Sequence, residues 1–302
     1  MVVYLRLMSM KPNRSIPYAV FLILCLIWSS TWMVIRIGLY SLPPFLAAAM
    51  RFTLAFFALL MYTLIKHRKN VFNIKQHLFF IRFGFLNFTG GYACVYWAEQ
   101  YIGSGLASVL FSVMPFYVLF LSIRMLPEER INWKKTLGVM FGFSGVALIF
   151  WDQLQFSQRD FFFMLSMMLV MIGPLFSALG TILAKQAMKQ IDVLTLNTMP
   201  LFYTAGSFYL LYYLFETNLP VVFDIKAIFS IVYLGLVGTA LAFILYFWLL
   251  KTRSAVMMSM ITFITPPLAL LWGWFILGER ITLSLIFGLT VILIGILMVR
   301  RR

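Results

Sequence analysis

The segment from Thr89 to Gln100 carries polar and aromatic side chains at helical spacing. Thr89, Tyr92, Tyr96 and Gln100 follow one another after 3, 4 and 4 residues, so an α-helix presents them as one stripe. Aromatic rings can cover the apolar body of a small molecule while hydroxyl and amide groups hold its polar end. The stripe therefore predicts one wall of a binding cavity, with helix–helix packing as the alternative.

Hydroxyl side chains repeat at similar spacing in other apolar segments. Ser108 and Ser112 lead to Pro115, and Ser259 and Thr262 lead to Pro266. Small hydroxyl residues also let helices approach closely in an apolar environment without binding anything. The predicted cavity residues are Trp28, Thr31, Trp32, Thr89, Tyr92, Tyr96, Ser108, Ser112, Ser177, Thr181, Tyr246, Ser259 and Thr262.

Glycine and proline residues mark weak points in the same segments. A proline removes one helical hydrogen bond and leaves a carbonyl oxygen free, which can face a ligand while the bend acts as a hinge. The alternative is a static kink, in which a neighbouring Ser or Thr bonds to the free carbonyl. The predicted hinge residues are Gly90, Gly91, Pro115, Pro174 and Pro266.

Glu99 is the acidic residue closest to an apolar stretch, and Arg36 and Arg51 belong near the same end of their segments. A charge in apolar surroundings is costly and commonly functional. One interpretation is that Glu99 pairs with Arg36 or Arg51 as part of an outer gate, or takes a proton during transport. The other is that each side chain extends to the water at the end of its segment.

The composition requires that these residues be positioned by membrane helices. The chain has 302 residues, of which 63% are hydrophobic and 11% charged. A soluble domain carries roughly 25% charged residues. A membrane-spanning helix needs about 20 apolar residues. The sequence predicts ten such helices, over residues 17–37, 44–65, 77–97, 104–125, 135–151, 161–184, 196–215, 227–249, 255–277 and 281–299.

The basic residues alternate with these predicted helices. When the N-terminus is placed inside, 18 of the 24 Lys and Arg residues fall in inner segments. The positive-inside rule therefore places both termini in the cytoplasm. The predicted location is the inner or plasma membrane of the cell. The net charge of +15 is then explained by topology and contact with anionic lipid, and no nucleic-acid partner is expected.

The second half of the chain repeats the first. At an offset of 151, Trp97 corresponds to Trp248 and Pro115 to Pro266, and at an offset of 150 Glu129 corresponds to Glu279. Each copy contains five predicted helices, so the second copy enters the membrane from the opposite side. Inverted repeats are a known basis of alternating access about a central site, which favours a transporter.

Several stretches resemble the EamA family of the drug/metabolite transporter superfamily. They are "WSSTWMVIRIGLYSLPPFLAAAMRF" (Trp28–Phe52), "YWAEQYIGSGLASVLFSVMP" (Tyr96–Pro115), "EERINWKKTLGVMFGFSG" and "GERITLSLIFGLTVILIG". The resemblance implies an all-α fold with one EamA module at 17–151 and another at 161–299. It also implies a central cavity lined by the first, third and fourth helices of each module, with the fifth at the periphery.

The predicted function is secondary transport of a small molecule, most simply export of amino acids or similar metabolites. Aromatic rings and hydroxyls suit a zwitterion or a neutral amphipathic ring. Multidrug or organic-cation export remains an alternative, because cations bind aromatic faces. Metabolite uptake or exchange by the same fold is another. No arginine is expected near the middle of the membrane, which disfavours a strongly anionic substrate.

Other classes of function fit the residues less well. The two His residues, His67 and His77, lie in one basic loop without further ligands, so neither a metal site nor a lipid-modifying catalytic centre is expected. The sequence contains no Walker A motif, so ATP is not the direct energy source and no cofactor is predicted. A channel would need a continuous polar path. Proton coupling and oligomeric state stay open.

Overall fold

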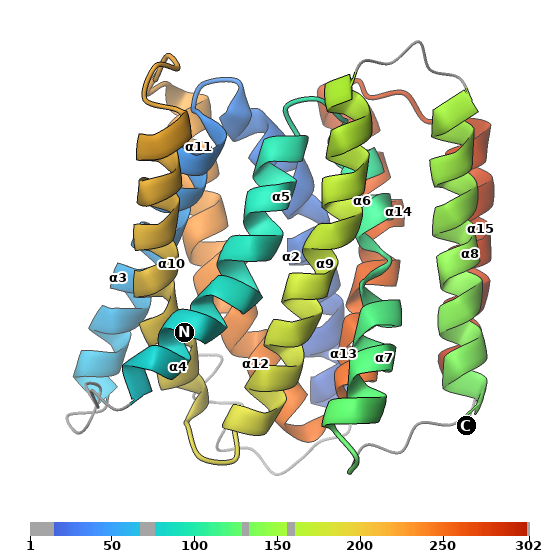
Figure 1. Ribbon diagram of the computed structural model, residues 1–302, viewed down its shortest axis with the longest axis horizontal. Helices are drawn as coiled ribbons and strands as arrows, with labels where there is room; N and C mark the ends of the chain where they lie inside the picture. Colours follow the sequence, from blue (N-terminus) through green and yellow to red (C-terminus); the bar gives the residue numbers. More distant parts are fainter. Residues whose placement is uncertain (1–14, 67–75, 129–132, 156–160, 301–302) are drawn as a thin grey trace.

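The computed structural model describes residues 15–66, 76–128, 133–155 and 161–300, and these residues form helices without any strand. Figure 1 shows the longer helices running side by side. The elements in chain order are α2 (Ser15–Leu39), α3 (Pro44–Lys66), α4 (His77–Gly84), η2 (Phe85–Thr89), α5 (Gly90–Ala98), α6 (Ser104–Phe111), α7 (Met114–Met125), α8 (Trp133–Gln155), α9 (Phe161–Ala187), α10 (Val193–Phe215), α11 (Ile225–Val232), η3 (Tyr233–Leu241), α12 (Ala242–Thr252), α13 (Ala255–Ser259), α14 (Ile261–Leu277) and α15 (Leu283–Arg300).

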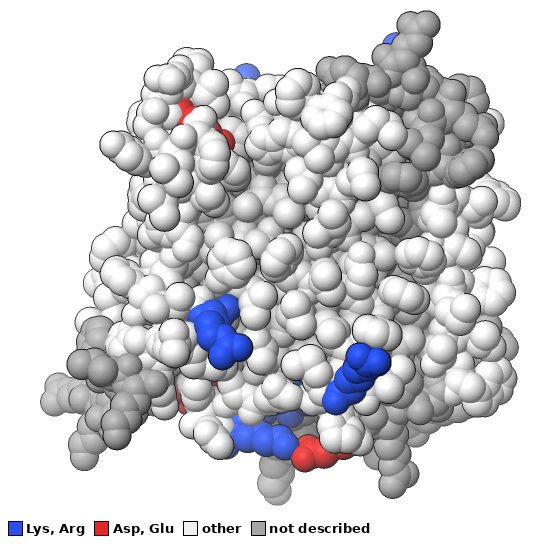
Figure 2. All heavy atoms as spheres, viewed as in Figure 1, with Lys and Arg blue, Asp and Glu red and all other residues white. Residues whose placement is uncertain are grey.

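The described helices have the length and surface of a membrane protein. Large apolar side chains face outward, with Phe275 78% and Ile225 77% exposed. Figure 2 shows an uncharged band across the middle of one face, with Lys and Arg side chains toward its lower edge. Seven described helical stretches could cross a membrane: Ile16–Leu39, Pro44–Ile65, His77–Ala98, Ser104–Met125, Phe161–Ala187, Ile225–Thr252 and Ala255–Leu277. The prediction of a helical membrane protein is therefore confirmed.

Two helices each contain a π-helical turn at corresponding places. α4, η2 and α5 form one continuous helix, because the residues at both ends of η2 keep right-handed helical φ and ψ. α11, η3 and α12 do the same around Tyr233–Leu241. At the offset of 151 found in the sequence, η2 corresponds to residues 236–240 inside η3. The predicted weak point at Gly90 and Gly91 thus directly follows a π turn, a feature common at functional sites.

Glycines bring the helix that contains η2 close to α9. A Cβ on Gly180 would lie 2.4 Å from the Cα of Asn87, and a Cβ on Gly91 would lie 2.6 Å from the Ser177 Oγ. Real Cβ atoms do not approach backbone atoms so closely, so the contact at Gly180 requires glycine, whereas a side chain at position 91 would have to displace the Ser177 hydroxyl. As a result, side chains from η2, α5 and α9 converge on one space.

The helix from Ser104 to Met125 and the helix from Ala255 to Leu277 are both interrupted near their middle. The first breaks at Ser112 and Val113, just before Pro115, and the second at Met260. Pro266 lies inside α14, where its missing N–H leaves the Thr262 carbonyl without a helical donor. The Ser112 Oγ donates to that carbonyl at 2.8 Å. A neighbouring serine therefore satisfies the carbonyl freed at this kink in the described conformation.

α8 and α15 stand at one side of the bundle and pack chiefly against each other (Figure 1). Glycines make the contact close, since a Cβ on Gly295 would lie 2.4 Å from the Gly138 carbonyl oxygen. None of the described side chains of these two helices lines the central cavity. The resemblance implies such a peripheral place for residues 135–151 and 281–299, the predicted fifth helix of each module.

Candidate functional site

A central cavity lies between α2, the η2–α5 segment, α6 and α7, α9, α12, and α13 and α14. The space open to the centres of water molecules measures about 100 Å³. One water needs about 10–15 Å³ on this measure, so the cavity has room for a small molecule. Its lining residues are Trp28, Thr31, Trp32, Ile35, Asn87, Gly91, Tyr92, Val95, Phe111, Met114, Ser177, Thr181, Phe243, Tyr246, Met258, Ser259, Ile261, Thr262 and Thr265.

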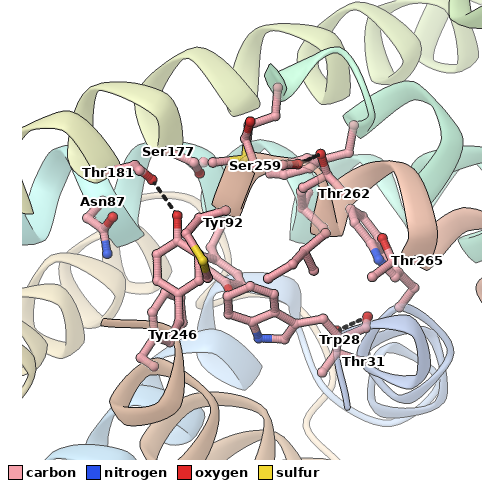
Figure 3. A pocket seen from close by; sticks show the side chains of 18 of the residues that line it. Trp28, Thr31, Asn87, Tyr92, Ser177, Thr181, Tyr246, Ser259, Thr262 and Thr265 are labelled. Atoms are coloured by element: carbon pink, nitrogen blue, oxygen red, sulfur yellow. Dashed lines mark hydrogen bonds between the residues drawn. The ribbon is translucent and has the colours of Figure 1, made fainter. Parts of the chain in front are cut away.

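Most of the residues predicted to share a cavity do so. Figure 3 shows the Thr181 and Tyr246 hydroxyls joined at one end, with Thr31 and Thr265 toward the other. The predicted hinge residue Gly91 also lines the space. The predicted residues brought together here are Trp28, Thr31, Trp32, Tyr92, Ser177, Thr181, Tyr246, Ser259 and Thr262.

Four predicted residues lie outside the cavity, each for a local reason. Ser108 donates to the Gly105 carbonyl of its own helix at 2.7 Å, and Ser112 donates to Thr262 in the kink described above. The Tyr96 hydroxyl accepts from Arg51. Thr89, the last residue of the π turn, is buried and its hydroxyl has no hydrogen-bond partner in the described structure. A stripe drawn at 3.6 residues per turn does not anticipate that turn, so it selects Thr89.

Several lining residues are not among those predicted from the sequence. Asn87 is a polar residue within the π turn, and its place in the cavity depends on that turn. Thr265 belongs to the same series of hydroxyls as Ser259 and Thr262 in the sequence, but it was not included among the predicted cavity residues. The others are apolar and do not differ in type from lipid-facing residues: Ile35, Val95, Phe111, Met114, Phe243, Met258 and Ile261.

Aromatic rings and hydroxyl groups determine the chemistry of the cavity. The Trp28 ring lies 5.4 Å from the Phe243 ring and 5.2 Å from the Tyr246 ring, centroid to centroid. The Ser259 hydroxyl donates to Val256 at 2.8 Å and the Thr262 hydroxyl to Ser259 at 2.7 Å, both to backbone carbonyls. Because these protons serve their own helices, the hydroxyl lone pairs remain as acceptors for a ligand donor.

Arg51 is buried behind the cavity wall, with 1% of its surface exposed. Its Nε donates to the Thr239 Oγ1 at 2.8 Å, and its Nη2 lies 3.4 Å from the Gly238 carbonyl oxygen. Gly238 and Thr239 occupy the middle of the helical stretch Ile225–Thr252. The expectations that Arg51 extends to the surface and that no arginine lies near mid-membrane are therefore wrong.

Glu99 is also buried, with no exposed surface, so extension to water is wrong for this residue too. No ion pair joins it to Arg36 or Arg51 in the described residues, and its two carboxylate oxygens have no hydrogen-bond partner. Arg36 is only partly buried and lies over the Tyr40 ring at 5.9 Å. Burial, and then the nearby Glu279, raise the pKa of the Glu99 carboxyl well above its ordinary value.

Carboxylates of the second half of the chain cap helices of the first half. The Glu279 carboxylate accepts from the Ser104 and Gly105 backbone N–H groups at 2.8 and 2.9 Å, and from the Ser104 hydroxyl at 2.8 Å. Glu216 accepts from the Phe45 N–H at 2.8 Å at the start of α3. An anion at a helix N-terminus is stabilised by the unpaired N–H groups there. These contacts tie the two halves together at one end of the bundle.

The described residues contain no group of three His, Cys, Asp or Glu side chains that could hold a metal ion. His77 instead contacts the Tyr203 hydroxyl through its Nδ1. His67 and Glu129, which also figure in the sequence analysis, lie outside the described residues.

Comparison with known proteins gives matches along most of the chain. The sequence model of the EamA-like transporter family matches twice, over residues 15–151 and 164–301. The "Uncharacterized transporter YoaV" of Bacillus subtilis (strain 168) is 30% identical over 275 residues, covering 90% of this chain and 92% of that protein. The "Uncharacterized inner membrane transporter YedA" of Escherichia coli (strain K12) is 24% identical, covering 91% and 88%. A solved crystal structure at 16% identity shares the fold with a TM-score of 0.73, covering 95% and 98%.

Proposed function

Because this chain belongs to the EamA-like transporter family, as its sequence motifs predict, and is a membrane transporter rather than an enzyme, we propose that it exports amino acids or similar small metabolites by secondary transport. In this proposal, alternating access exposes the central cavity to each side of the inner or plasma membrane in turn. One observation carries the proposal: the cavity is lined by helices of both matched segments, with aromatic rings and hydroxyls on its walls.

The proposed topology is ten membrane helices in two five-helix repeats of opposite orientation, with both termini in the cytoplasm. It adds α8, α10 and α15 to the seven apolar stretches of the described structure. The two matched segments, the π turns at corresponding positions and the paired helix interruptions support it. The distribution of basic residues supports the orientation.

The proposed substrate lies against the rings of Trp28, Trp32 and Tyr246, which cover its apolar part. The Ser259 and Thr262 oxygens accept from its amino group, since their own protons serve the helix. Tyr92, Ser177, Thr181 and Thr31 provide further polar contacts around the same space.

The proposed moving parts are the interrupted helices beside the cavity. The hinges are Gly90 and Gly91 after the π turn, and Pro115, Pro174 and Pro266 in α7, α9 and α14. Glu99 and Arg36 belong to the gate at the end of the bundle where Glu279 caps α6. In this proposal, a proton on Glu99 couples to transport.

Counterflow in liposomes tests the proposed function. Purified protein is reconstituted with unlabelled amino acids inside, and uptake of each labelled amino acid is followed. We expect Trp28→Ala to reduce exchange by at least about tenfold, because it removes a large aromatic contact with the substrate. Trp274→Ala is the matched control, because that side chain is 57% exposed on the outside of α14.

The outcome separates the proposal from its alternatives. Accumulation of organic cations and not amino acids would favour multidrug export, and net inward transport would favour an uptake or exchange carrier. Label that equilibrates without accumulating would indicate a channel. Equal loss of exchange in Trp28→Ala and Trp274→Ala would argue against the cavity as the substrate site.

A further inference from the structure

The Arg51 guanidinium lies one side-chain layer away from the cavity. Its Nη2 is 3.5 Å from the Tyr92 hydroxyl oxygen, and its Cζ lies 4.6 Å from the centroid of the Tyr92 ring. The Gly238 carbonyl oxygen that faces Nη2 also accepts from the Trp28 Nε1 at 3.3 Å. Both Tyr92 and Trp28 line the cavity. The charge of Arg51 therefore acts on the cavity through two of its wall residues.

No acidic side chain forms an ion pair with Arg51 in the described residues. No carboxylate lies within 4.0 Å of it, and the side chain of the buried Glu99, which interacts with Arg51 only at longer range, makes no hydrogen bond. Its partners are neutral: the hydroxyls of Thr239, Tyr92 and Tyr96 and one carbonyl oxygen. A buried cation without a counter-charge is unfavourable, and its field is weakly screened where water is excluded. An anionic group in the cavity would supply the missing charge.

Tyr92 can transmit this preference by a direct hydrogen bond. Its hydroxyl oxygen accepts from Arg51, so the hydroxyl proton remains available to a ligand. A phenol that accepts from a guanidinium is polarised toward donation, and a carboxylate is the acceptor that gains most from it. No acidic side chain appears among the cavity-lining residues of the described structure, so none competes for this position.

We propose that Arg51, acting through Tyr92, makes the cavity select substrates that carry a carboxylate over the corresponding amides and amines. The inference rests on the proposed transport function and narrows its substrate class to carboxylates, including zwitterionic amino acids. Arg51 is a specificity-determining residue in this scheme. Tyr92 is the residue that contacts the carboxylate of the substrate.

Four probes of matched shape test the selection: L-phenylalanine, 3-phenylpropionate, L-phenylalaninamide and phenethylamine. The first two carry a carboxylate and the last two do not. Binding to purified protein is measured by the change in tryptophan fluorescence, since Trp28 and Trp32 line the cavity. We expect the carboxylates to bind at least about tenfold more tightly than their counterparts, as for a charge-assisted hydrogen bond.

Substitutions test whether Arg51 causes the preference for carboxylates. We expect Arg51→Gln to bring the ratio of affinities close to one, and Arg51→Lys to retain part of it. Tyr92→Phe keeps the ring but removes the hydroxyl donor, so it should lower the ratio of carboxylate to non-carboxylate affinities. This variant tests the proposal even if Arg51→Gln does not fold. Arg82→Gln is the control, because this exposed arginine lies away from the cavity and should leave the ratio unchanged.

Three results would overturn the inference. They are amides or amines that bind wild-type protein as well as carboxylates do, carboxylates that do not bind at all, and a ratio that persists in both Arg51→Gln and Tyr92→Phe. Counterflow of amines that still requires Trp28 would show transport through this cavity in the form of the organic-cation alternative, and it would reject the carboxylate selection. Absence of counterflow with every class of substrate would instead reject the transport function itself.

Discussion

The Glu99 side chain is a buried carboxyl group whose pKa links the stability of the protein to pH. It follows the last residue of α5, is fully buried, and has neither an ion pair nor a hydrogen bond in the described structure. Burial raises its pKa first, Glu279 adds to the effect, and Arg36 and Arg51 oppose it. The folded protein therefore holds this proton to higher pH than the unfolded chain does.

This pKa shift predicts how stability depends on pH. For an acid whose folded pKa is raised, stability is highest below the ordinary pKa of 4.5 and is lost as pH rises through the folded pKa. Glu99→Gln is neutral throughout, so we expect its thermal stability to fall less between about pH 5 and about pH 8 than that of wild type. Thermal unfolding in detergent measures both slopes.

Two other acids define the controls for this experiment. Burial raises the pKa of Glu216 to about 7, so Glu216 also lowers the thermal stability as pH rises. The stability of Glu99→Gln should therefore depend on pH less than that of wild type, but should still depend on it. Glu128 pairs with Lys189 on the surface, and the pKa of Glu128 is lowered, so Glu128→Gln should keep the wild-type slope in this range. Identical slopes for wild type and Glu99→Gln would show that Glu99 is not a buried proton site.

At the scale of elements, the close approach of η2 to α9 positions one side of the cavity. We expect Gly180→Ala to lower the melting temperature and weaken ligand binding, because its Cβ would lie 2.4 Å from the Cα of Asn87 and must push the backbone of η2 away. Gly206→Ala in α10 is the matched control. Its Cβ meets nothing within 4 Å. It should stabilise the helix by about 0.5–1 kcal/mol.

Differential scanning fluorimetry and the fluorescence binding assay measure both glycine variants. A Gly180→Ala protein as stable as Gly206→Ala would mean that η2 and α9 can separate without cost, and that the π turn does not depend on this contact.

The elements also show what the sequence could and could not predict. Long apolar runs predict each helix, and the spacing of hydroxyls on α9, α13 and α14 predicts Ser177, Thr181, Ser259 and Thr262 in the cavity. The π turns have no signal at this level, because a periodicity of 3.6 residues does not distinguish them from the α-helix that continues on either side. They decide that Asn87 and not Thr89 faces the cavity. Apolar lining residues such as Phe243 are equally hidden, since only tertiary packing separates them from lipid-facing ones.

At the scale of the molecule, one end of the bundle is held by bonds between the two family-matched segments. Glu279 caps α6, Glu216 caps α3, and the Val222 N–H donates to the Ser41 carbonyl at 2.9 Å. In a transporter that exposes its cavity alternately, such bonds must break when this end opens. The proposed topology, with both termini in the cytoplasm, places these bonds on the outer side of the membrane. The topology can be tested directly.

Tyr40 and Lys189 make the most direct test of the inverted repeat. Tyr40 follows the first helix of the first segment and is 58% exposed, and Lys189 follows the first helix of the second segment and is also exposed. Two copies of the same orientation would place both on one side of the membrane. Copies of opposite orientation place them on opposite sides, with Lys189 in the cytoplasm according to the positive-inside rule.

Single cysteines are introduced as Tyr40→Cys and Lys189→Cys after the native Cys25 and Cys94 are replaced by serine. We expect a membrane-impermeant maleimide to label the cysteine at position 40 in intact cells, and the cysteine at position 189 only after the membrane is permeabilised. Labelling of both from the same side would remove the inverted repeat. The helix caps made by Glu279 and Glu216 could then no longer be placed on the outer side of the membrane, because the positive-inside rule would not hold for the second segment.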